Sequence, residues 1–87
     1  MKLKILGKEV MTSRQSETAT VVVGMFTAYI TPVDVCGKIL RYDWTLMVRG
    51  SNSFITGTVG PGDPEEAVRA IDAAAKKVIA ERDMVRR

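Results

Sequence analysis

The sequence predicts an α+β protein of the two-layer ββββα type: an antiparallel β-meander of about four strands with one C-terminal helix packed on one face. Segments with strand-like alternation follow one another along the chain and are separated by short turns rich in glycine or proline. Only the stretch from Pro64 to about Met84 has the spacing of an amphipathic helix. Successive hairpins give an antiparallel sheet, on which a terminal helix packs. With 87 residues and one cysteine, the chain is expected to form a single domain, 1–87, without an intramolecular disulfide.

The N-terminal segment predicts a short hairpin or a kinked strand. Lys2 to Ile5 alternates polar and apolar residues, and Val10 and Met11 are apolar again. Gly7-Lys8 lies between them, and glycine in the first position of a two-residue loop favours a type II′ turn. The polar residues 12–17 that follow are expected to form a loop.

Residues 18–30 are apolar on both faces when they are read as one strand. One face would hold Ala19, Val21, Val23, Met25 and Tyr29, and the other would hold Val22, Phe26, Ala28 and Ile30. Gly24, in the middle, is expected to form a bulge or a bend. The strand would extend ~43 Å and the helix only ~32 Å. One helix therefore leaves apolar surface uncovered, which a curled sheet, a second copy of the chain or a partner would have to bury.

The next strand has the most regular alternation. Residues 32–38 predict a turn because Pro32, Asp34 and Gly37 favour chain reversal. The inward set of the strand after it is Leu40, Tyr42, Trp44, Leu46 and Val48, and the outward set includes Arg41, Asp43, Thr45 and Arg49. A turn at residues 50–52 and a last strand at 53–59, weakened by Gly57, complete the expected sheet.

The helix has conventional start and stop signals. Asp63 is the expected N-cap, Pro64 the first helical residue, and Glu66 the third residue of a capping box. The apolar stripe consists of Val68, Ile71, Ala75 and Val78. Expected surface ion pairs are Glu65–Arg69 and Asp72–Lys76, and the helix dipole is complemented at its end by Arg82, Arg86 and Arg87.

The residue types argue against catalysis. The chain has no histidine, which removes the commonest general base and metal ligand. Cys36 lacks an activating partner and is interpreted as a structural cysteine. The glycines between Gly57 and Gly62 precede a helix, but the acidic residues at its start would repel phosphate. We expect no enzyme activity, no catalytic residue, no cofactor and no metal site.

The charge distribution leaves a nucleic-acid interface as the second choice. The net charge is +3, and the excess lies in residues 1–62. A basic sheet face would use Arg41, Thr45, Arg49, Lys38, Lys2 and Lys4. Tyr42 and Trp44, however, share the apolar face and are expected in the core. No apolar run approaches the ~20 residues of a membrane helix, and the single cysteine fits a reducing compartment, so a cytoplasmic location without membrane contact is expected.

The first hypothesis is a non-catalytic protein-binding module. If the helix covers Tyr42 and Trp44, the opposite face shows apolar side chains such as Ile39, rimmed by charged ones. The predicted partner-binding residues are Arg41, Asp43, Met47 and Arg49. A homodimer is also expected, formed sheet on sheet or by pairing of edge strands. The compact plan resembles small phage or mobile-element accessory proteins, and this resemblance implies an accessory factor or inhibitor acting by stoichiometric contact.

Overall fold

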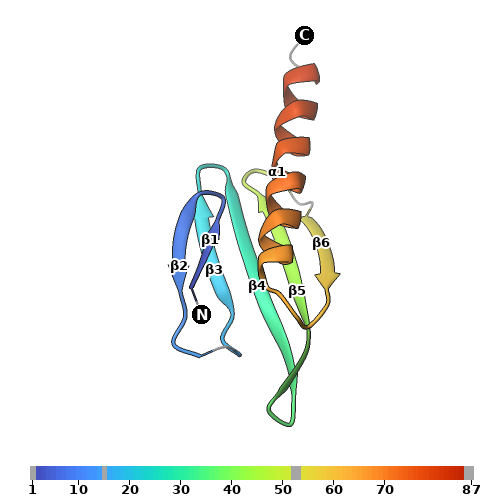
Figure 1. The fold of residues 1–87 in the computed structure, drawn as a ribbon. Helices are drawn as coiled ribbons and strands as arrows, with labels where there is room; N and C mark the ends of the chain where they lie inside the picture. The colour runs from blue at the N-terminus through green and yellow to red at the C-terminus, as the bar shows by residue number, and fades with distance from the viewer. Residues whose placement is uncertain (1, 15, 52–53, 86–87) are drawn as a thin grey trace.

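The computed structural model describes residues 2–14, 16–51 and 54–85 and confirms the α+β plan. A four-stranded antiparallel sheet has the order β3-β4-β5-β6, and a separate two-stranded hairpin precedes it (Figure 1). The elements are β1 (Lys2–Ile5), β2 (Lys8–Met11), β3 (Ala19–Val23), β4 (Phe26–Val35), β5 (Lys38–Val48), β6 (Phe54–Val59) and α1 (Glu65–Val85). The expected contributions of Asn52, Ser53, Arg86 and Arg87 lie outside the described residues. No helix in the described ranges is long and apolar enough to span a membrane.

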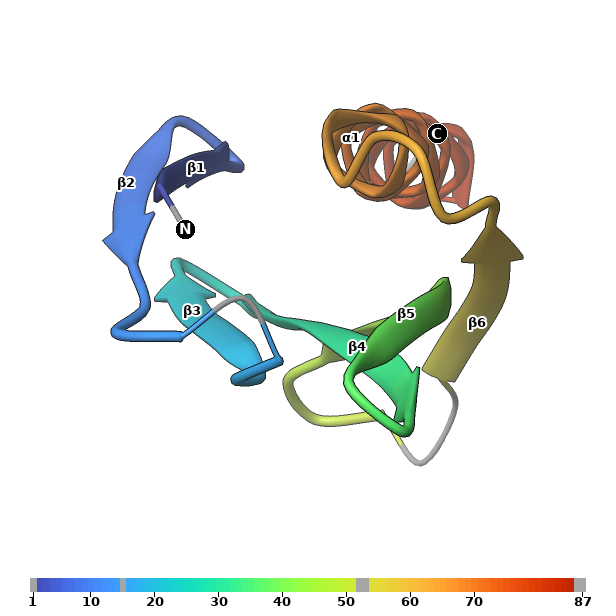
Figure 2. The same ribbon diagram turned by 60° about the horizontal axis from the view of Figure 1, so that its bottom comes forward.

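Two elements, not one, cover the inner face of the sheet. The sheet is curved, and α1 and the β1–β2 hairpin lie side by side over its concave side (Figure 2). Helix α1 contacts β4, β5 and β6 and also touches β1, while β2 contacts β3. The core between the layers consists of Leu3, Ile5, Ala19, Val21, Phe26, Ala28, Ile30, Tyr42, Trp44, Leu46, Ala67, Val68, Ile71 and Ala75. The convex face carries no second layer.

The segment expected to be one long strand is a hairpin. Val23 pairs with Phe26, so Gly24 and Met25 form a two-residue loop, and Gly24 has a φ of +57°. Residues directly opposite each other in a hairpin share a face. The inward positions therefore change from odd numbers in β3 to even numbers in β4, and both halves of the segment face the same core. This reversal explains why the sequence looks apolar on both faces, and the prediction of a single strand is wrong.

Two further turns differ from their predicted positions. Ile5 pairs with Lys8, so the first loop is Leu6-Gly7, with φ values of 53° and 81°, and not Gly7-Lys8. Positive φ at both loop residues indicates a type I′ turn instead of the expected type II′. Cys36 and Gly37 form the same kind of loop, so β4 continues through residues 32–35. Pro32 is tolerated there because the pairing with β3 ends at Ile30 and leaves one side of β4 open.

A β-bulge changes which side chains of β5 face the core. Val33 pairs with Arg41 and Asp34 pairs with Ile39, so Leu40 has no residue opposite it. Leu40 is 48% exposed, whereas Ile39 packs against the core. The expected positions of these two side chains are therefore reversed. The remaining inward set is confirmed, with Tyr42, Trp44 and Leu46 buried and Val48 partly buried.

The predicted start of α1 is confirmed. The Glu65 N–H donates to Asp63 Oδ1 at 2.9 Å, which is the N-cap bond. The expected apolar stripe packs on the sheet, with Val78 half-buried at its end. Arg69 Nη2 lies 3.8 Å from Asp63 Oδ2, so this arginine pairs with the cap instead of with Glu65. At the other end, Arg82 Nη1 lies 2.7 Å from Met25 Sδ and joins the helix to the β3–β4 turn.

Candidate functional site

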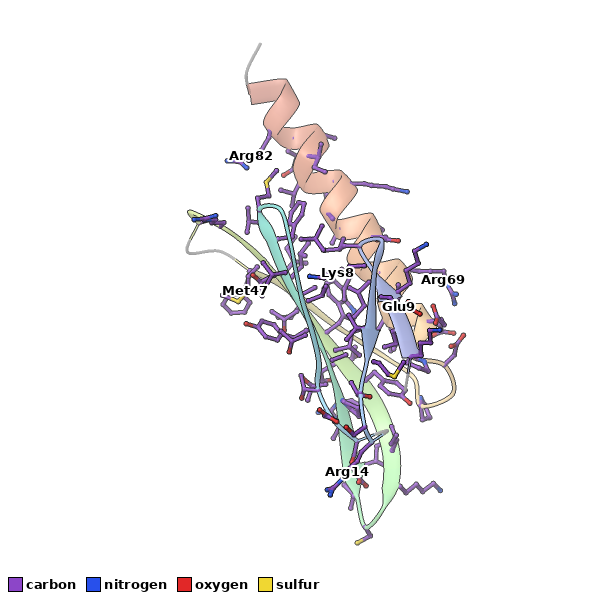
Figure 3. The ribbon with its side chains drawn as sticks, turned by 90° about the vertical axis from the view of Figure 1, so that its left-hand side faces the viewer. Lys8, Glu9, Arg14, Met47, Arg69 and Arg82 are labelled. Atoms are coloured by element: carbon purple, nitrogen blue, oxygen red, sulfur yellow. The ribbon has the colours of Figure 1, made fainter. Side chains whose placement is uncertain are left out.

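No element of the described ranges covers the convex side of the sheet, which we call the outer face. The alternating register assigns to it Thr20, Val22, Thr27, Tyr29, Thr31, Val33, Arg41, Asp43, Thr45, Met47, Phe54, Thr56 and Thr58. Met47 points away from the layer that holds α1 and the first hairpin. Arg69 of α1 and Glu9 of the hairpin lie on the opposite side (Figure 3). On β3, β4 and β5, inward neighbours such as Val21, Ala28 and Leu46 are buried in the core and fix the strands that carry these positions.

One end of the outer face is apolar. Val22, Thr27, Met47 and Phe54 lie directly opposite one another across the four strands, and we call them the apolar row. The exposed fractions of Val22, Met47 and Phe54 are 60%, 43% and 62%. Neighbouring exposed apolar side chains of this size are typical of contact surfaces and not of scattered surface residues.

A hollow beside the apolar row brings two of the predicted site residues together. It has a volume of about 440 Å³, and its lining includes Val22, Thr27, Met47 and Arg49. The Arg49 N–H donates to the Met25 carbonyl at 2.7 Å, which fixes the end of β5 against the β3–β4 turn. Arg49 therefore contributes a basic residue to the lining of this hollow.

The other two predicted site residues pair with each other at a different place. Arg41 Nε lies 3.0 Å from Asp43 Oδ1, and their side chains are 53% and 39% exposed. The pair is internally neutral and is screened by solvent, so it presents little net charge. Arg41 and Met47 are six positions apart on β5, which is roughly 20 Å along the strand. The four predicted residues thus form two groups, and Ile39, expected between them, packs against the core.

Threonine side chains occupy most of the surface between these two groups. Thr20, Tyr29, Thr45 and Thr56 form the cross-strand row next to the apolar row, and Thr31, Asp43 and Thr58 form the row after it. Hydroxyl groups can donate and accept hydrogen bonds without adding charge. The outer face is therefore polar in its middle and nearly uncharged.

The basic residues are distributed over both layers. Lys2 Nζ lies 2.7 Å from Glu9 Oε1 on the first hairpin, and Lys4 is exposed on β1. Lys38 lies beside the turn between β4 and β5, and Thr45 is on the outer face. Arg41 lies on the outer face and is already paired with Asp43. These positions do not form one basic surface with aromatic residues between them.

The remaining candidates for chemistry are far from the apolar row. Cys36 is exposed in the turn between β4 and β5, and its interpretation as a structural cysteine stays a prediction. An open groove of about 600 Å³ lies between that turn and the start of α1, and Asp34, Lys38 and Tyr42 contribute to its lining. The described part of the chain contains no group of three or more His, Cys, Asp or Glu side chains suited to a metal ion.

Of the four residues of the apolar row, the sequence analysis predicts only Met47 as a site residue and misses Val22, Thr27 and Phe54. Phe54 was treated only as part of a weak strand, although its alternation with Ile55 and Gly57 could have placed it outward. Val22 was grouped with residues that the hairpin turns inward. Comparisons of the chain with protein-family models, curated proteins and solved structures give no match, so the outer face itself is the basis for a functional proposal.

Proposed function

We propose that this chain is a non-catalytic protein-binding module that acts by stoichiometric contact through its outer face. The contact centres on the apolar row and on Arg49, with the Arg41–Asp43 pair at the far rim. Accessory proteins and inhibitors of phages and mobile elements work by contact of this kind, and the proposal extends to that role.

The observation that carries the proposal is the apolar row. Three apolar side chains, Val22 on β3, Met47 on β5 and Phe54 on β6, are more than two-fifths exposed in one cross-strand row. The row lies beside a hollow of about 440 Å³ whose lining includes Arg49. Protein interfaces combine an apolar centre with a polar rim, and arginine and aromatic residues often contribute most of the binding energy. The near absence of net charge on this face supports a protein partner over a phosphate backbone, which requires several free cations.

The test uses Met47→Asp with Ile79→Asp as its control. Met47 and Ile79 are both 43% exposed, but Ile79 is on α1, away from the outer face. Proteins from the source cells are passed over the immobilised chain, and the affinity of the retained protein is then measured for each variant. We expect Met47→Asp to weaken binding roughly tenfold or more, because a carboxylate in an apolar contact is desolvated without a partner. Ile79→Asp should leave the affinity unchanged.

Two results would contradict the proposal. Equal affinity of the wild type and Met47→Asp would remove the apolar row from the interface. Retention of nucleic acid that is lost as salt increases would favour the second choice, a basic nucleic-acid interface that includes Arg41 and Arg49.

A further inference from the structure

Strand β6 is an open edge of the sheet. It pairs with β5 on one side, and no other strand within residues 2–14, 16–51 and 54–85 pairs with it. Alternate residues of an edge strand direct N–H and C=O groups away from the sheet, where another strand can bind them. The opposite edge strand, β3, differs because β2 contacts it (Figure 2).

The sequence of β6 lacks the usual protection of an edge. Phe54–Val59 reads FITGTV and contains no charged residue and no proline. Phe54 and Ile55 are 62% and 37% exposed. Natural edge strands are normally blocked by lysine, proline, bulges or a covering loop, and an unprotected one is a site for pairing with another strand.

The chain has more surface than a compact monomer of its mass, to which the end of α1 that projects beyond the sheet contributes (Figure 1). A compact monomer of 9.5 kDa exposes roughly 5,050 Å², whereas this chain exposes 5938 Å². Its radius of gyration is 13.6 Å, against about 12 Å for a compact domain of this length. The excess surface of about 900 Å² matches the ~800 Å² that each partner buries in a standard interface.

We infer that the β6 edge pairs with β6 of a second copy of this chain, antiparallel about a two-fold axis, to form one continuous sheet. An isologous contact requires a surface that is complementary to itself, and antiparallel pairing of two identical strands meets that requirement. The absence of charge in β6 means that the copies meet without like-charge repulsion. This inference does not depend on the outer face binding a partner.

The register that keeps both outer faces on one side pairs outward residues with outward residues. Pairing Thr56 with its own copy meets this condition and places Phe54 opposite Thr58 of the second copy. Because α1 contacts β6 as well as β5, this pairing would place the helices of both copies on the inner side of the joined sheet. The two apolar rows then belong to one extended face.

The test compares Thr56→Lys with Thr20→Lys. Both threonines are exposed and lie at opposite ends of the same cross-strand row, on β6 and β3. Sedimentation equilibrium from about 1 to 100 μM should show the wild type at twice its 9.5 kDa mass. Thr56→Lys places two ammonium groups opposite each other and should weaken the dimer roughly tenfold or more. Thr20→Lys should leave it unchanged.

A second measurement is independent of charge. In a Cys36→Ser background, Thr56→Cys should be linked between two copies by a short bismaleimide, and Thr20→Cys should not. A wild-type monomer at every concentration would overturn the inference, as would a dimer that survives Thr56→Lys. A dimer that Met47→Asp dissociates would also overturn it, because the sheets would then pack face to face. A dimer that survives Met47→Asp supports the edge contact even if the partner-binding proposal fails.

Discussion

At the scale of single residues, the side chain of Trp44 leaves room only for glycine at position 57. The two residues are directly opposite on β5 and β6, and a Cβ at position 57 would lie 2.6 Å from three atoms of the indole ring. The sequence suggests only that glycine weakens this strand. In the folded protein the indole ring lies over Gly57. The methyl group of an alanine at this position would displace the ring.

Gly57→Ala should therefore destabilise the protein by about 1–3 kcal/mol, because the ring must leave its packed position. Gly60→Ala is the matched control, since a Cβ at position 60 meets nothing within 4 Å. Urea unfolding followed by the fluorescence of Trp44, the one tryptophan of the chain, measures both variants. Equal unfolding midpoints for the two alanine variants would show that the packing of the Trp44 ring does not require glycine at position 57.

At the scale of elements, the bulge in β5 separates two leucines that simple alternation assigns to the same face. Leu46 is fully buried, whereas Leu40 is 48% exposed. Leu46→Ala should cost about 2–5 kcal/mol of unfolding free energy through the cavity that it leaves. Leu40→Ala should cost less than about 1 kcal/mol. Chemical denaturation of both variants at one protein concentration tests this. A loss of unfolding free energy for Leu40→Ala as large as that for Leu46→Ala would indicate that β5 has no bulge and that Leu40 faces the core.

The elements also show how far the sequence predicts the structure. The helix and its cap follow from local signals, Asp63 and an apolar stripe of helical period, which do not depend on distant contacts. The β3–β4 hairpin was missed because Gly24 fits a bulge as well as a turn, and only pairing between strands distinguishes them. For the same reason the sequence does not predict Val22 as part of the apolar row, since Val22 shares a face with Met47 only in the hairpin register. The outward position of Met47 follows from the alternation of β5, which is regular beyond its bulge, and the role of Met47 and Arg49 in binding stays a prediction.

At the scale of the whole molecule, the two sheets share one core. Leu3 and Ile5 of the first hairpin are buried in the same cluster as Trp44 and Ile71. The hairpin should therefore not unfold separately from the rest, and the chain should behave as a single cooperative unit.

Ile5→Ala tests this unity. Ile5 has no exposed surface, and its truncation should destabilise the protein by about 2–5 kcal/mol. The transitions followed by Trp44 fluorescence and by far-ultraviolet circular dichroism should move together, although Trp44 is in the other sheet. Met11→Ala, at a side chain that is 74% exposed, should shift neither. A fluorescence midpoint that stays at the wild-type value in Ile5→Ala would mean that the hairpin unfolds independently.

The contact between β1 and α1 also has a consequence for the order in which the protein acquires its structure during synthesis. Every strand pairs with a strand next to it in the chain, although β2 and β3 belong to different sheets. Each hairpin can therefore close soon after it is made. The inner layer cannot, because α1 begins about 60 residues after β1 ends. At a synthesis rate of roughly 5–20 residues per second, Leu3 and Ile5 remain without their helical partner for about 3–12 s. During that interval the nascent sheet exposes apolar surface on both faces. A chaperone that binds extended apolar segments could bind the nascent sheet during this time.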